Sequence, residues 1–173
     1  LVSILERRIA LGPESHEELA ALQFRLGREL ELHLDDKEKA VEIYREVLTA
    51  LPEHEGARTS LEGLLDDDAV GLTAAEILEP VYEERGDWES LVRALTVLAL
   101  GQSDAARQHE LSTKIAEIYG TRIGDARKSF DALLSAFESS PDQVETLGRL
   151  EMLAVEQDRF EELVTRISNL AGK

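Results

Sequence analysis

The stretch that decides the fold runs from Leu22 to Pro52 and reads LQFRLGRELELHLDDKEKAVEIYREVLTALP. It occurs a second time from Leu111 to Pro141, as LSTKIAEIYGTRIGDARKSFDALLSAFESSP, displaced by 89 residues (111 − 22 = 89). Each copy carries apolar residues at helical spacing with one turn in the middle, which predicts a pair of antiparallel helices. Most shared positions are apolar and none is a catalytic group, so the duplication preserves packing. The matched positions are Leu22 and Leu111, Leu26 and Ile115, Leu30 and Tyr119, Asp36 and Asp125, Lys39 and Lys128, Tyr44 and Leu133, and Leu48 and Phe137.

Start and stop signals divide the rest of the chain into further helices, and no segment has a convincing strand pattern. Ser15 opens a capping box, in which a hydroxyl accepts a free backbone N–H. Thr73 with Glu76 is predicted to do the same, and Ser140 is predicted to cap a helix whose first residue is Pro141. We therefore expect about ten helices. Their predicted ranges are 1–11, 15–34, 36–50, 53–65, 73–85, 88–100, 103–119, 125–138, 140–156 and 158 onward.

The repetition continues beyond the helical pair. The triplet Leu61, Glu62 and Leu64 recurs at the same offset as Leu150, Glu151 and Leu153. The pattern predicts repeat copies around 15–65 and 104–154 within a single array over 1–173. The second period is expected to be shorter, without a counterpart of the 73–85 helix. Repeats of this kind cannot bury their apolar faces alone, so we expect them to stack into an elongated array.

Composition excludes several classes of protein. Apolar residues make up 43% of the 173 residues and there are only 4 prolines, which is typical of a folded chain. The formal charge of −17 disfavours nucleic acid and anionic lipid as partners, since phosphate binding needs Lys and Arg. No apolar run is as long as a membrane span and no signal peptide is visible. The absence of cysteine removes disulfides and thiolate sites, and together these features favour a cytoplasmic location. The chain opens on Leu1-Val2 in mid-pattern, which we interpret as a fragment of a longer protein.

Candidate chemistry is sparse. Three His-Glu pairs are adjacent in sequence and lack the i, i+4 spacing that places two ligands on one helix face, so we interpret them as surface residues. The run Asp66-Asp67-Asp68 has no calcium-loop glycine pattern and reads as a solvated turn and cap. Trp88 is replaced by Phe160 in the echoed phrase near the C-terminus, which favours core packing over ligand stacking. No nucleophile has a partner at catalytic spacing and no Gly-rich phosphate loop is present, so the sequence predicts neither an enzyme nor a cofactor or metal site.

The duplicated pair resembles the tetratricopeptide repeat. That family's pattern has a small residue after Leu, an aromatic three residues on, then Ala, an aromatic and a terminal Pro. The first copy offers Leu26-Gly27, Leu30, Ala40, Tyr44 and Pro52. The second copy offers Ile115-Ala116, Tyr119, Ser129, Leu133 and Pro141. Both copies have one more residue between the helices than the family pattern, and HEAT and half-a-TPR arrays remain alternatives. The resemblance implies an all-α, right-handed superhelix of antiparallel pairs, with Gly27 and Ala116 at close helix contacts.

The resemblance also implies a function. Such arrays hold a peptide, helix or domain of another protein, and the first helix of each pair lines the groove. An accessory domain that packs against a catalytic module of its own longer polypeptide is the alternative. The charge favours a basic or amphipathic partner, and the oligomeric state is left open. Phe24 is either an exposed anchor or buried between helices. The predicted groove positions are Phe24, Arg28 and Glu31, then Thr113, Glu117 and Gly120.

Overall fold

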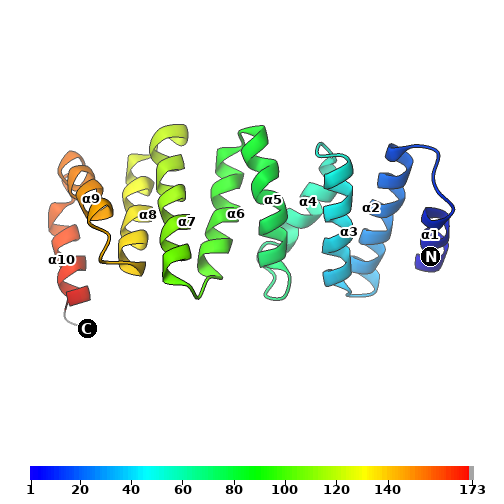
Figure 1. Cartoon of the computed structure of the whole chain (residues 1–173), viewed down its shortest axis with the longest axis horizontal. Coiled ribbons are helices and arrows are strands. Elements are labelled where there is room, and N and C mark those ends of the chain that lie inside the picture. Colours follow the sequence, from blue (N-terminus) through cyan, green and yellow to red (C-terminus); the bar gives the residue numbers. More distant parts are fainter. Residues whose placement is uncertain (172–173) are drawn as a thin grey trace. The chain divides into compact units, whose positions relative to one another are not determined.

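The computed structural model describes residues 1–171, and over that range the chain is all helical, as predicted, with no strand (Figure 1). Ten α-helices and one short π-helical turn follow one another along the chain. They are α1 (Val2–Ala10), α2 (His16–His33), α3 (Lys37–Ala50), α4 (Glu55–Leu64), α5 (Gly71–Arg85), α6 (Trp88–Leu100), α7 (Ala105–Ile118), η1 (Tyr119–Ile123), α8 (Ala126–Ser139), α9 (Val144–Glu156) and α10 (Phe160–Ala171).

The helices form two compact units, of which the first is Leu1–Arg85 with α1 to α5 and the second begins at Gly86 with α6 to α10. Four helices of the second unit start 89 residues after their counterparts in the first (105 − 16 = 126 − 37 = 144 − 55 = 160 − 71 = 89). Helix α10 is thus the counterpart of α5, and the prediction that the second period lacks one was wrong. Phe160, which echoes Trp88 in the sequence, begins α10 and lies 89 residues after Gly71, the first residue of α5.

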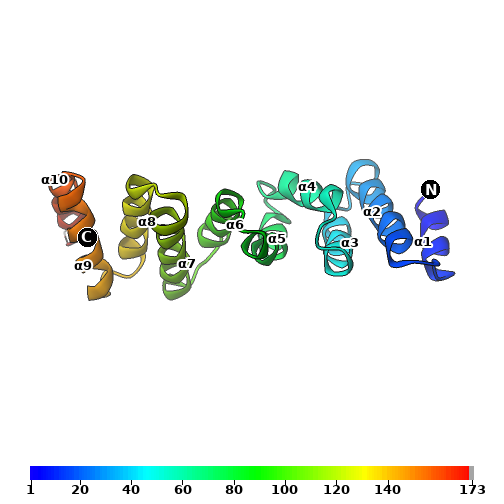
Figure 2. The ribbon, with the colours of Figure 1, turned by 90° about the horizontal axis from the view of Figure 1, so that it is seen from above.

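Consecutive helices within each unit pack against each other, most extensively in the duplicated pairs α2–α3 and α7–α8. In the first unit α3 also contacts α5, and Figure 2 shows that α4 lies to one side of these two helices. In the second unit one buried cluster joins α7, α8, α9 and α10. Its members are Ala116, Phe130, Leu133, Leu134, Phe137, Leu150, Ala154 and Leu163.

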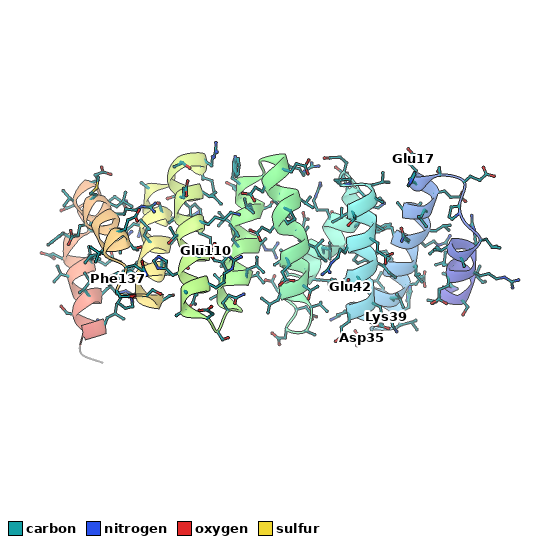
Figure 3. All side chains as sticks on the ribbon, viewed as in Figure 1. Glu17, Asp35, Lys39, Glu42, Glu110 and Phe137 are labelled. Carbon is teal, nitrogen blue, oxygen red and sulfur yellow. The ribbon has the colours of Figure 1, made fainter. Side chains whose placement is uncertain are left out.

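Side-chain caps fix several helix starts. Ser15 accepts the N–H of Glu18, as predicted, at 3.1 Å. Asp36 and Asp125, which are equivalent positions, cap α3 and α8 by accepting the N–H three residues on. Lys39 reaches back to Asp36, with 2.6 Å between Nζ and Oδ2, at the turn where Figure 3 labels Lys39.

Two predicted caps were wrong. Helix α5 begins at Gly71, ahead of Thr73, because the Asp67 carboxylate already accepts two N–H groups that precede the helix. Ser140 ends α8 instead of opening α9, because its N–H completes a bond to the carbonyl of Ala136. Helix α9 begins after Gln143, whose side chain makes no capping bond.

Candidate functional site

The predicted groove residue Phe24 lies on α2, half-buried between α3 and α4. Its ring centroid is 4.8 Å from that of His54 and 5.9 Å from that of Tyr44. Gly56 of α4 faces the ring so closely that a Cβ there would lie 2.6 Å from Phe24 Cζ. Phe24 therefore packs between helices with only part of its surface in solvent.

Arg28 and Glu31 surround the end of the Tyr44 side chain. The Tyr44 hydroxyl donates to Glu31 Oε2 at 2.6 Å, and Tyr44 itself is fully buried. Arg28 donates to the hydroxyl of Ser60 on α4 at 3.4 Å and lies 3.6 Å from Glu31. Burial, reinforced by the Glu31 carboxylate, raises the pKa of the Tyr44 phenol, so the ring stays protonated and hydrogen-bonded. In the first unit, these side chains therefore fill the space between α2 and α4.

The second unit differs at the same place. A hollow of about 280 Å³ lies between α7, α8 and α9, and we call it the α7–α9 hollow. Of the predicted residues, Glu117 and Gly120 line it. Thr113 does not, and its hydroxyl is buried with no hydrogen-bond partner among the described residues. The lining residues are Ala116, Glu117, Gly120, Thr121, Ser129, Leu133, Arg149, Met152, Leu153 and Glu156.

The 89-residue offset explains why the hollow exists. Leu133 stands where the first unit has Tyr44, and Gly120 stands where it has Glu31. The residues equivalent to the neighbours of the Tyr44 hydroxyl, which are Glu117, Gly120 and Arg149, all line the hollow. The shorter leucine leaves vacant the space that the phenol ring fills in the first unit.

The charged groups at the hollow are unpaired. Neither Glu117, Arg149 nor Glu156 forms an ion pair with another residue in the range 1–171. Met152 is 67% exposed although its side chain is apolar, and it forms part of the wall. The hollow thus combines an apolar surface with two free carboxylates and one free guanidinium.

The sequence interpretation missed Leu133, Arg149 and Met152 as site residues. The signal was present in the aligned copies, since a buried Tyr44 becomes Leu133 while its acceptor Glu31 becomes Gly120. Those paired losses of volume indicate a vacated space.

A second depression, of about 490 Å³, lies in the first unit between α3 and α5. It is lined by apolar residues such as Ile77, Pro80 and Val81, with Glu76 and Glu84 at its edge. None of the predicted groove residues lies there. Its position on the second helix of the pair separates it from the surface that the resemblance implied.

The described residues show no arrangement suited to a metal ion, since no three His, Asp or Glu side chains gather at one point. Within the acidic triplet, Asp67 is engaged as a cap and pairs with Lys37 at 2.7 Å. Lys37 lowers the pKa of the Asp67 carboxyl through this hydrogen bond. No helix within residues 1–171 is both long and apolar enough to cross a bilayer.

The sequence matches no protein-family model and no curated protein.

Proposed function

We propose that this chain is a non-catalytic scaffold that binds a peptide, helix or domain of another protein, and that the partner docks at the α7–α9 hollow. The observation that carries the proposal is the contrast between the duplicated surfaces. Tyr44 fills the first, whereas the second is an open apolar hollow with unpaired charges at Glu117, Arg149 and Glu156. Concave apolar sites with a few polar groups are the usual form of a recognition surface.

We further propose that the helices belong to a right-handed superhelical array like that of tetratricopeptide repeats. Two features support this assignment: the repeated order of helices, and the small residues Gly27 and Ala116 at the contact within each pair. A radius of gyration clearly above the roughly 15–16 Å of a globule of this length is expected in small-angle X-ray scattering. A value within that range would contradict the array.

The docking proposal is tested by photo-crosslinking at the hollow. A photoreactive phenylalanine analogue at Met152 should capture the partner from cell extract, because that side chain lies in the wall and is exposed. The same analogue at Val144, which is 80% exposed but does not line the hollow, is the matched control. The crosslinked protein is then identified by mass spectrometry.

A variant that fills the hollow supplies the specificity control. Ala116→Gly, Gly120→Glu and Leu133→Tyr place the residue types of Gly27, Glu31 and Tyr44 at the equivalent positions of the second unit, and Ala116→Gly is included because Gly27 leaves room for the Tyr44 ring. We expect the Met152 crosslink to disappear in this filled variant. A crosslink that persists would refute docking at the hollow, and a crosslink only to the remainder of the chain's own polypeptide would favour an accessory domain.

A further inference from the structure

We propose that the α7–α9 hollow receives an aromatic side chain of the partner, with tyrosine preferred, next to a basic residue. This inference rests on the proposed function, because it names the occupant of the same site. It is argued from the first unit, where the equivalent space already holds such a side chain.

The shape of the hollow fits an aromatic ring. In the first unit the ring of Tyr44 reaches between α2 and α4, where its hydroxyl meets Glu31. In the second unit, Leu133 occupies the position of Tyr44 and lines the hollow of about 280 Å³. A ring that enters from solvent would lie against Leu133, Leu153 and Met152, which form the apolar part of the lining.

The polar groups fit a phenol hydroxyl. The first unit surrounds the Tyr44 hydroxyl with one guanidinium and one carboxylate, from Arg28 and Glu31. The second unit again supplies one of each, but from other positions: Glu117 stands where the first unit has Arg28, and Arg149 of α9 stands where it has Ser60. An acceptor and a donor for a phenol are thus both present. An aliphatic anchor such as leucine would leave these groups unused.

The charge of the edge favours a neighbouring cation on the partner. Glu117 and Glu156 are both exposed and unpaired among residues 1–171, whereas Arg149 is the single cation of the lining. The charge of Arg149 offsets only one of the two carboxylates, so the hollow keeps one net negative charge. A lysine or arginine beside the aromatic residue would pair with it, and this part of the binding should weaken with salt.

The test uses the full chain and three seven-residue peptides that have a lysine on each side of the centre. The central residue is tyrosine, leucine or serine. Amide shifts of the 15N-labelled protein are followed by NMR during titration with each peptide. We expect saturable shifts at Gly120, Thr121 and Met152 with the tyrosine peptide, affinity at least about fivefold weaker with the leucine peptide, and no saturable shift with the serine peptide.

Variants locate the binding. Met152→Lys, which replaces an exposed apolar wall residue by a cation that repels the lysines of the peptide, should abolish the tyrosine-peptide shifts, and the filled variant should do the same if its helical circular dichroism is retained. Glu117→Gln with Glu156→Gln should weaken binding several-fold and flatten its salt dependence. Glu89→Gln with Glu151→Gln removes the same charge from exposed positions outside the hollow and should change neither.

The outcomes separate the two proposals. Equal affinity of the leucine and tyrosine peptides overturns the aromatic preference but not docking at the hollow. Shifts that survive Met152→Lys, or no binding of the tyrosine peptide at all, overturn this inference. The photo-crosslinking result decides the proposed function independently, because it does not depend on the choice of peptide.

Discussion

Gly27 shows how one absent methyl group determines a helix contact. A Cβ at this position would lie 2.6 Å from Cε1 of Tyr44, closer than side-chain atoms approach each other, so α2 and α3 can pack with the full ring between them only if residue 27 is glycine. At the equivalent contact Ala116 has its methyl group and faces Leu133 instead of a ring. The small residue and the side chain that it faces thus change together between the copies: Gly27 faces a tyrosine ring, whereas Ala116 faces a leucine.

Substitution of Gly27 by leucine should destabilise the protein. The added side chain overpacks the contact with Tyr44 and is expected to lower the free energy of unfolding by about 1–3 kcal/mol. Chemical denaturation monitored by circular dichroism measures the change. Gly148→Ala is the control, because a Cβ there meets nothing within 4 Å and α9 should gain up to about 1 kcal/mol. Unchanged stability of Gly27→Leu would refute the close contact.

The equivalent helices α4 and α9 start differently. His54 caps α4, with its Nδ1 accepting the N–H of Ala57 at 3.1 Å. The equivalent residue of α9 is Gln143, which makes no capping bond. The N–H groups at the start of α9 therefore lack the side-chain partner that α4 has.

Removal of the α4 cap and addition of a cap to α9 should change the stability of the protein in opposite directions. His54→Ala removes the cap and is expected to cost about 1 kcal/mol, whereas Gln143→Asp adds a carboxylate at a helix start and should contribute about 0.5–1 kcal/mol. Thermal melts of the two variants beside wild type measure both effects. A Gln143→Asp variant that melts at the wild-type temperature would contradict the assigned start of α9.

The caps of α3 and α8 should make stability depend on pH. The Lys39 ammonium lowers the pKa of Asp36, and the backbone N–H of Lys128 lowers that of Asp125, from the ordinary value of 3.8. A carboxyl with a lowered folded-state pKa contributes stability above its unfolded pKa and loses it as the pH falls through the folded value.

The double variant Asp36→Asn and Asp125→Asn tests this dependence. The amides can still accept an N–H, but they do not titrate. We expect the melting temperature of wild type to fall further than that of the double variant between about pH 5 and about pH 2, a window that starts above the ordinary carboxyl pKa and extends below it. Equal decreases in melting temperature for the two proteins would show that Asp36 and Asp125 are not the source of the pH dependence.

At the scale of the whole molecule, the chain consists of two compact units that repeat the same helix order. Each unit has its own buried residues, such as Tyr44 and Tyr82 in the first and Phe130 and Leu150 in the second. Since burial of apolar surface is the main stabilising term, a unit with its own core is able to fold by itself.

Residues 1–85 expressed alone should therefore fold. The expected result is a helical circular dichroism spectrum with a cooperative thermal transition, because α1 to α5 keep the contacts that they make within the unit. Helical signal that is lost gradually on heating, without a transition, would show that the first unit depends on the rest of the chain. Residues 1–50, which lack α4 and α5, serve as the destabilised control.

The sequence by itself determined the helical class and most helix boundaries. These follow from local periodicity, capping chemistry and a duplication that can be aligned by eye. It failed at Ser140 and Thr73, where a capping residue was present but a neighbouring helix end or the Asp67 side chain had already satisfied the backbone.

Only the tertiary structure decided where the surface is filled and where it is open. The hydrogen bond between Tyr44 and Glu31 joins residues that are 13 positions apart in the sequence, and the α7–α9 hollow is bounded by three helices. A shorter side chain at Leu133 can leave a cavity, or the neighbouring side chains can repack to fill the space. Which of the two occurs depends on the distance between the backbones of the three helices. That separation is set by all the side chains between the helices together, so no single stretch of sequence contains it.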